Sequence, residues 1–169
     1  MTAQLRIESL TKIHNRTEFD CGNQALNTFL QTTARQHNDK GLSKTFVLCR
    51  DNNQSYIIGY MTLVVCEVLA DDIPHTWQKK YPRRIPAAKL AKLAISSDYQ
   101  QQGYGEILLI DAIQKTLTAS KSIGLSGLFV DAKDKQAKAY YQRFGFIALA
   151  EQLNNLFIPL ATLQNLSLK

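Results

Sequence analysis

A glycine-containing turn past the middle of the chain could bind a phosphate group. Gly103 and Gly105 stand between an apolar stretch predicted to be a strand, Lys89 to Ser96, and a helical pattern from Glu106 to Lys121. Backbone N–H groups at the start of a helix have no partner within it, and glycine presents no Cβ to an approaching anion. Strand-to-helix turns also use glycine for conformational reasons, so this turn indicates an anion site only together with a second feature.

Two other phosphate-binding motifs do not fit this turn. The Walker A motif requires lysine after its last glycine, whereas Glu106 follows Gly105. The dinucleotide fingerprint requires a third glycine where Leu108 stands, and it normally opens its domain. The sequence therefore argues against ATP and NAD as ligands.

The excess of positive charge lies in one segment. The 169 residues include 20 Lys and Arg and 14 Asp and Glu, which gives a net charge of +6. Between Ile73 and Lys92 there is no acidic residue, and the basic residues there account for the whole excess: Lys79, Lys80, Arg83, Arg84, Lys89 and Lys92. Such a patch attracts polyanions such as RNA; the alternative is a solvated loop that only keeps the protein soluble.

Composition excludes several other classes of protein. With 45% hydrophobic and 20% charged residues, positions 1–169 are predicted to form one globular domain, neither disordered nor disulfide-stapled. The longest apolar run, Tyr56 to Cys66, falls short of the ~20 residues of a membrane span, and no signal peptide is visible. We therefore expect a cytoplasmic protein with no membrane partner. Reduced thiols and no metal are expected because the cysteines and histidines are scattered: Cys21, Cys49, Cys66, His14, His37 and His75.

Apolar periodicity predicts the elements of the first half of the chain. A strand is expected at Leu5 to Ser9, and a helix that Asn23 caps is expected to run as far as His37. Lys44 to Arg50 and Tyr56 to Leu69 are predicted to pair as an antiparallel hairpin. The stretch from Asp71 to Pro86, which lacks clear periodicity, is predicted to be a long, partly ordered loop.

The second half predicts a strand–helix–strand unit followed by further elements. The run from Leu90 to Val130 should be a right-handed crossover between parallel strands. A helix from Asp134 to Phe144, capped by Asp134 and ended by Gly145, is expected next, and three strands complete the pattern: Leu128 to Ala132, Phe146 to Ala150 and Leu156 to Leu163. The predicted fold class is α/β, with a mixed, mostly antiparallel sheet of six to seven strands flanked by about four helices.

The glycine turn and a later helix together resemble the two signatures of the GNAT acetyltransferase superfamily. Gln100, Gly103 and Gly105 match its pyrophosphate loop, Arg/Gln-x-x-Gly-x-Gly/Ala, and Ala137 to Phe146 match its helix, A-x-x-F/Y-Y-x-x-x-G-F. The resemblance implies a GNAT fold and acetyl-CoA as co-substrate. It assigns acetyl-CoA binding to the end of one strand and to the loop: Leu93, Ala94, Ile95, Gln100, Gln101, Gln102, Gly103, Tyr104, Gly105 and Glu106.

Further residues are similar to the GNAT toxins of bacterial type II toxin-antitoxin modules, over about positions 19 to 163. They include Cys21-Gly22, Leu26-Asn27, Phe29-Leu30, Ala34, Ser43, Thr45 to Val47, Ile58 to Tyr60, Ile85-Pro86 and Leu90 to Ile95. One departure is Ala91, where many members have glycine. The resemblance implies acetylation of the α-amine of aminoacyl-tRNA, which blocks translation, together with a ribbon-helix-helix antitoxin as partner and a homodimer.

Acetyl transfer from a thioester to an amine needs a donor for the oxyanion and a proton for the departing sulfur. The resemblance assigns the donor to a backbone N–H of Leu93 to Ile95 and the proton to Tyr141. A phenol of pKa ~10 can protonate a thiolate whose thiol has a pKa of ~8.5, although Tyr141 could instead be a core aromatic. No strong general base is visible. An α-amine has a pKa of ~7.7–8.0 and is partly neutral at cytosolic pH, whereas a lysine amine has a pKa of ~10.4 and depends more on a general base. The missing base therefore favours an α-amine acceptor.

Three functions remain open from the sequence. The first is an aminoacyl-tRNA N-acetyltransferase acting as a toxin. The acceptor stem of its tRNA substrate would be bound by Lys80, Arg83, Arg84 and Lys92, with Arg35 and Lys44 as secondary candidates. The second is a GNAT enzyme that acetylates a small amine or a protein N-terminus. The third is a non-catalytic RNA-binding regulatory module, which only the basic segment supports.

Overall fold

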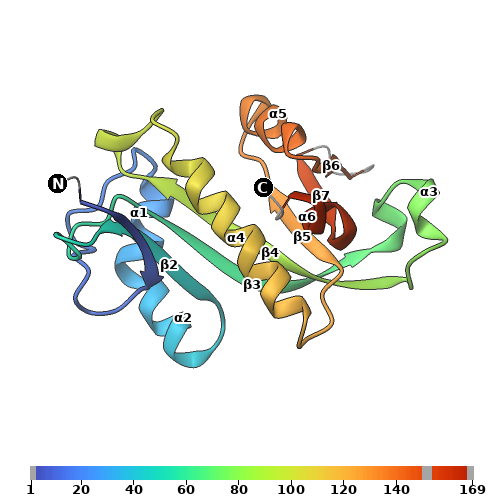
Figure 1. Cartoon of the computed structure of the whole chain (residues 1–169), viewed down its shortest axis with the longest axis horizontal. Helices are drawn as coiled ribbons and strands as arrows, with labels where there is room; N and C mark the ends of the chain where they lie inside the picture. The colour runs from blue at the N-terminus through green and yellow to red at the C-terminus, as the bar shows by residue number, and fades with distance from the viewer. Residues whose placement is uncertain (1–2, 150–153, 167–169) are drawn as a thin grey trace. The chain divides into compact units, whose positions relative to one another are not determined.

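The computed structural model describes residues 3–149 and 154–166. Seven strands form one mixed sheet in the order β1-β2-β3-β4-β5-β7-β6 (Figure 1). The pairs β1–β2, β2–β3, β5–β7 and β6–β7 are antiparallel, and β4–β5 is parallel, which confirms the predicted sheet. The strands are β1 (Leu5–Ser9), β2 (Lys44–Arg50), β3 (Gly59–Leu69), β4 (Arg84–Ile95), β5 (Gly127–Asp131), β6 (Ile147–Ala148) and β7 (Asn155–Pro159).

Six α-helices occur in the described part of the chain, rather than about four: α1 (Gln24–Thr32), α2 (Ala34–Lys40), α3 (His75–Gln78), α4 (Tyr104–Ser120), α5 (Lys135–Arg143) and α6 (Leu160–Leu166). The helix predicted to reach His37 is divided at Thr33, where two successive β-branched threonines disfavour a continuous helix. The last predicted strand ends at Pro159, which has no N–H to continue a ladder, and α6 follows. None of the described helices has the length and apolar character of a membrane span.

The chain divides into two compact units. The first contains the residues up to Val64 and those from Ala91 to Ala112, and the second contains the remainder. Strands β3 and β4 and helix α4 each run from one unit into the other. The prediction of a single domain over residues 1–169 stays a prediction.

In the first unit, helices cover both faces of the strands. Leu30 of α1 and Tyr60 of β3 belong to one apolar cluster together with residues of α2, β2 and β4. Neighbouring residues of a strand point to opposite faces, and Gly59 accordingly faces α4. A Cβ at position 59 would lie 3.2 Å from a side-chain carbon of Leu108 and closer still to Ile95. A Cβ there would also lie 2.8 Å from the backbone carbonyl oxygen of Ala94, so the close approach of β4 to β3 requires glycine at this position, and α4 adds a tight contact.

The second unit orders the segment that was predicted to be a loop. Ile73 and Ile85 are buried in an apolar cluster with Phe157 of β7, and Trp77 and Tyr81 pack against that cluster. The backbone N–H of residue 70 also donates to the carbonyl of residue 83, at 2.9 Å. The segment therefore contains a 3-10 turn (Ala70–Asp72), helix α3 and the start of β4, because its widely spaced apolar residues all reach one core.

A buried pair of hydroxyls in the first unit provides a test of the fold. Thr45 of β2 and Thr62 of β3 have their Oγ1 atoms 2.8 Å apart, and both residues are almost fully buried. Thr45→Val should lower the free energy of unfolding by about 1–3 kcal/mol, because the hydroxyl of Thr62 loses its partner. The double variant with Thr62→Val should recover most of that loss. Urea unfolding measures the free energy of unfolding of each variant. A loss in the double variant equal to the sum of the losses in the two single variants would contradict the pairing.

Candidate functional site

The turn predicted to bind phosphate leads from β4 into α4 within the first unit. Gln101 has φ of 62° and Gly103 has φ of 87°, so both are left-handed. This conformation is uncommon for a residue other than glycine. Turns of this kind gather successive N–H groups into concavities that bind anions. Among the described residues, no protein acceptor takes the backbone N–H groups of residues 101–106.

The strand end and the loop are held together. Ser96, which follows β4, donates its backbone N–H to the carbonyl of Ile58 at 2.8 Å. The side-chain amide of Gln100 donates to the carbonyl of Ile95 at 2.9 Å and to that of Cys21 at 2.7 Å. The first unit therefore brings the predicted acetyl-CoA residues of the strand, Leu93 to Ile95, next to those of the loop. The donors of the Gln100 side chain are used within the protein, so they are not available to an anion.

Tyr141, the predicted general acid, lies on helix α5 in the second unit. Asp134 caps this helix by accepting the backbone N–H of Ala137 at 2.8 Å, and the helix stops before Gly145, whose φ is 101°. The ring of Tyr141 packs edge-on against Phe146, with 5.4 Å between centroids. Burial, and to a lesser extent Tyr140, raises the pKa of Tyr141 to about 12. Its hydroxyl therefore keeps its proton at neutral pH.

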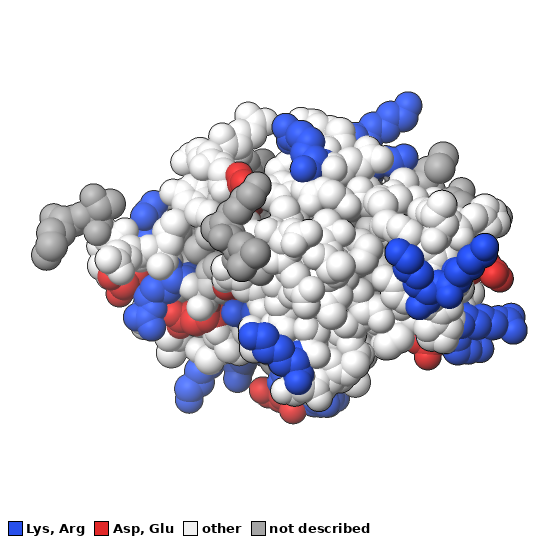
Figure 2. Space-filling view, turned by 45° about the vertical axis from the view of Figure 1, so that its right-hand side comes forward, with Lys and Arg blue, Asp and Glu red and all other residues white. Residues whose placement is uncertain are grey.

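The basic residues differ in how far they are engaged. Arg84 pairs with Glu67 at 3.0 Å, and Lys89 pairs with Asp131 at 3.0 Å, in the second unit. Lys79, Lys80 and Arg83 are exposed and form no ion pair with any described residue. In the first unit, the ammonium of Lys92 lies 5.2 Å from the ring centroid of Phe29. Figure 2 shows basic side chains projecting from the surface in several groups.

Sequence reasoning missed a second set of cations, on and just before helix α5. Lys133, Lys135 and Arg143 are exposed, Lys138 is half-buried, and none of them forms an ion pair within the described residues. Lys138 lies one turn before Tyr141, and residues three apart are neighbours on a helix surface. Counting charge on the exposed face of each predicted helix, rather than along segments, would have found this set.

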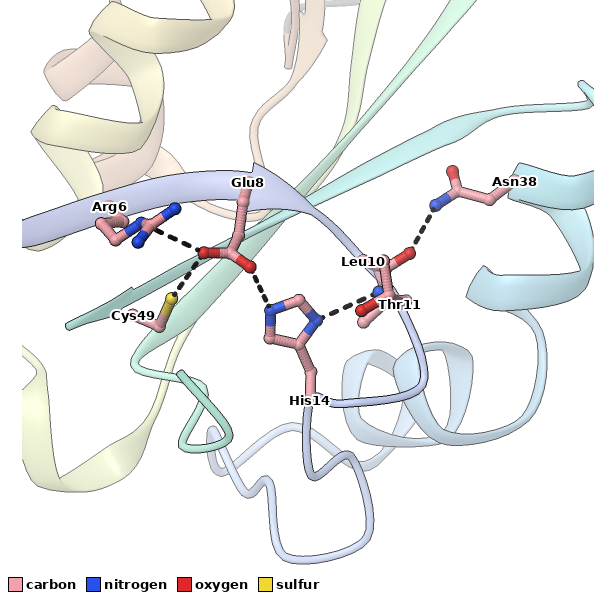
Figure 3. Close-up of polar contacts among 7 residues, drawn as sticks. All are labelled: Arg6, Glu8, Leu10, Thr11, His14, Asn38 and Cys49. Atoms are coloured by element: carbon pink, nitrogen blue, oxygen red, sulfur yellow. Dashed lines mark hydrogen bonds and ion pairs between the residues drawn. The ribbon is translucent and has the colours of Figure 1, made fainter. Parts of the chain in front are cut away.

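A polar cluster in the first unit is formed by the half-buried Glu8 of β1 with two buried residues, His14 and, from β2, Cys49 (Figure 3). His14 Nδ1 accepts the backbone N–H of Thr11 at 3.0 Å, and Nε2 lies 3.1 Å from Glu8 Oε2. The thiol of Cys49 donates to Glu8 Oε1 at 3.5 Å, and Arg6 lies 3.4 Å from the same oxygen. Ligand atoms of Glu8, His14 and Cys49 lie within 4.8 Å of one another, so the group has the composition of a metal site.

Hydrogen bonding in this cluster is that of a structural network. Because Nδ1 of His14 accepts an N–H, the neutral ring carries its proton on Nε2, where a metal would need a lone pair. Burial, and then the charge of Glu8, raises the pKa of the Cys49 thiol to about 11, so the sulfur also holds a proton. The thiol donates its hydrogen bond to Glu8 and not to the imidazole of His14. The cluster therefore lacks the Cys–His pair of an activated nucleophile.

Comparison with known proteins decides the family. The profile of the Acetyltransferase (GNAT) family matches residues 7–146. The chain belongs to this family. It is 33% identical over 130 residues to the tRNA-acetylating toxin of Mycobacterium tuberculosis, covering 77% of this chain and 76% of that protein.

Solved structures of family members extend the match to nearly the whole chain. The toxin AtaT in complex with acetyl-methionyl-tRNAfMet superimposes with a TM-score of 0.89 at 34% identity, covering 96% of this chain and 99% of that chain. A tyrosine-to-phenylalanine mutant of AtaT, bound to acetyl-CoA and the C-terminus of the antitoxin AtaR, gives a TM-score of 0.82 at 32% identity, covering 98% and 99%. This chain is thus a GNAT acetyltransferase similar to toxins over its full fold.

The state of the Cys49 thiol can be measured by alkylation. With a pKa of about 11, only about one thiol in a thousand is ionised at pH 8, and the thiolate is the reactive form. Iodoacetamide at pH 8 should therefore leave Cys49 unlabelled in the folded protein and label it in urea, as followed by peptide mass spectrometry. Labelling of Cys49 at equal rates in the two conditions would contradict the buried, protonated thiol.

Proposed function

We propose that this chain transfers the acetyl group of acetyl-CoA to the α-amine of an aminoacyl-tRNA and so acts as a toxin that blocks translation. The observation that carries the proposal is the match, over nearly the whole fold, to AtaT in complex with an acetylated aminoacyl-tRNA. The tRNA-acetylating toxin of Mycobacterium tuberculosis supports the same substrate class. Acetyl-CoA as co-substrate is supported by the family and by the bound acetyl-CoA of the AtaT mutant.

In this proposal the first unit binds acetyl-CoA through its backbone. The pyrophosphate is received by the N–H groups of residues 101–106, which have no protein partner among the described residues. The start of helix α4 favours an anion there, because its first N–H groups are unpaired and its dipole is positive. An N–H on Leu93 to Ile95 stabilises the oxyanion.

The reaction requires one proton donor and no strong base. The neutral α-amine attacks the thioester carbonyl, the C–S bond breaks, and the nitrogen releases its proton to water. Tyr141 gives its proton to the departing sulfur. Its raised pKa, about 12, means that it is fully protonated at neutral pH and regains its proton from solvent after each turnover.

Two sets of exposed cations are proposed to bind the phosphates of the acceptor stem. Lys80 and Arg83 are the strongest members because they form no ion pair, whereas Arg84 is already bound to Glu67. Lys92 stands one residue before the strand end that faces the thioester. The cations of α5, on the helix that carries Tyr141, add phosphate contacts to this set.

Regulation is proposed to follow the pattern of the relatives. A cognate antitoxin, of the ribbon-helix-helix type, would keep the enzyme inactive; AtaT itself binds the C-terminus of the antitoxin AtaR. We also propose that the chain is a homodimer that acts in the cytoplasm, where charged tRNA is present.

The activity is tested by transfer of radiolabelled acetyl groups from acetyl-CoA to a charged total tRNA pool. Wild type should label the charged pool and not deacylated tRNA. Tyr141→Phe should lower the rate by about 10²–10⁴-fold, the usual contribution of a general acid, while its acetyl-CoA affinity stays unchanged. Label on polyamines or protein N-termini alone would favour the alternative acceptors. RNA binding that is independent of acetyl-CoA, without any transfer, would favour a binding module.

The role of the basic segment is tested by the salt dependence of tRNA binding. The double variant Lys80→Ala, Arg83→Ala should reduce the slope of log affinity against log salt by about 0.9 for each phosphate that is no longer neutralised. Lys12→Ala, Lys40→Ala removes the same charge from exposed positions outside the segment and should leave the slope unchanged. Equal slopes for the two double variants would mean that the charges of the segment are only solvated and do not bind tRNA.

A further inference from the structure

A short turn before helix α1 is bound to the loop that leads into α4. The backbone carbonyl of Asp20 accepts the N–H of Ser97 at 2.9 Å, and that of Cys21 accepts the amide of Gln100 at 2.7 Å. Ser97 and Gln100 lie just before the left-handed Gln101. Two hydrogen bonds thus connect the turn at residues 20–22 to the loop that presents the unpaired N–H groups, all within the first unit.

Asn27, on helix α1, determines the shape of that turn. Its side-chain oxygen accepts the backbone N–H of Cys21 at 2.9 Å, and its amide donates to Asp20 Oδ1 at 2.9 Å. The same oxygen of Asp20 accepts the N–H of Gly22 at 2.9 Å, and these two bonds hold the pKa of Asp20 below its usual value. Asn27 is only 6% exposed, and Gly22 has φ of 85°, which disfavours any side chain there.

The loop needs such support because part of it is strained. A left-handed conformation at a residue such as Gln101 persists only where the surrounding structure determines it. Gln100 supplies the constraint on one side by bonding the carbonyls of Ile95 and Cys21 together. The Cys21 carbonyl can serve as a fixed acceptor only while the turn itself is fixed, and Asn27 is the buried side chain that fixes it.

We propose that Asn27 is a positioning residue for acetyl-CoA: it holds the turn at residues 20–22, which through Ser97 and Gln100 keeps the loop N–H groups in the arrangement that receives the pyrophosphate. Asn27 does not itself contact the co-substrate. The inference rests on the proposed function, because it names a residue that serves the same acetyl-CoA site. It also gives a role to the Cys21-Gly22 and Leu26-Asn27 motif, for which the chemistry of transfer provides none.

A second buried asparagine provides the matched control. Asn38 of helix α2 is 9% exposed and accepts the N–H of Thr45 at 2.8 Å, while its amide lies 3.4 Å from the carbonyl of Leu10 (Figure 3). It therefore resembles Asn27 in burial and bonding, in the same unit. These bonds join α2 to the start of β2 and to the residue after β1, and not to the loop before α4. A purely structural role would make Asn27→Ala and Asn38→Ala behave alike.

The test measures acetyl-CoA binding by isothermal titration calorimetry, well below the unfolding midpoint of each variant. Asn27→Ala should raise the dissociation constant by about tenfold to a hundredfold, the effect of a small displacement of a binding group. Gln100→Met, which removes the donors at an exposed position without adding charge, should do the same. Asn38→Ala should bind acetyl-CoA within about twofold of wild type. In the transfer assay, Asn27→Ala should raise the KM for acetyl-CoA and leave kcat nearly unchanged.

Several outcomes would overturn the inference. Folded Asn27→Ala that binds acetyl-CoA as wild type does would exclude the role of Asn27, and an equal loss in Asn38→Ala would reduce it to general stability. If Asn27→Ala does not fold, Gln100→Met decides, and wild-type affinity in that variant overturns the inference. Failure of the proposed function looks different, because wild type itself would then bind no acetyl-CoA or transfer no acetyl group to tRNA.

Discussion

The proposed function depends on one requirement, which is that the loop before α4 keeps its backbone N–H groups free of protein partners, as they are among the described residues, and still holds a single shape. Free donors give a segment no hydrogen bonds of its own to stabilise it, so the stability must come from neighbouring segments. Here the neighbours are the end of β4, which Gln100 binds through Ile95, and the turn at residues 20–22. Left-handed geometry at Gln101 is the local strain that this support maintains.

The two units contribute different chemistry. The first offers backbone donors, whose N–H dipoles attract a phosphate without any ionisable group. The second offers a phenol and free cations. Burial keeps the phenol of Tyr141 protonated, whereas Lys80 and Arg83 stay exposed, so their charges are available to a polyanion. Cations that already have partners, such as Arg84 with Glu67 and Lys89 with Asp131, are less available.

Local sequence was enough to predict the elements whose signals are local. The caps at Asn23 and Asp134, the bounds of β1 and β2, and the parallel pair β4–β5 all follow from short patterns and connection rules, and the structure confirms them. The break at Thr33 and the helix after Pro159 were missed because apolar periodicity continues through both positions. The segment from Asp71 to Pro86 is ordered by residues that meet only in a distant core.

For the site, the sequence motif located the loop but not its support. The hydrogen bond from Gln100 to Cys21 joins residues far apart in the chain, and no periodicity reveals it. The Glu8, His14 and Cys49 network likewise arises from three segments that the sheet brings together. The cations around α5 could have been found from the sequence. They were missed because charge was counted along segments, which does not show which residues share the exposed face of a helix.

The central claim, acetylation of an α-amine on charged tRNA, is tested most directly by identifying the product. Charged tRNA is incubated with the enzyme and acetyl-CoA, digested with nuclease, and the aminoacyl-adenosine released from the 3′ end is examined by tandem mass spectrometry. The account predicts aminoacyl-adenosine heavier by one acetyl group, with that group on the α-nitrogen. Unmodified aminoacyl-adenosine from an enzyme that consumes acetyl-CoA on other amines would contradict it.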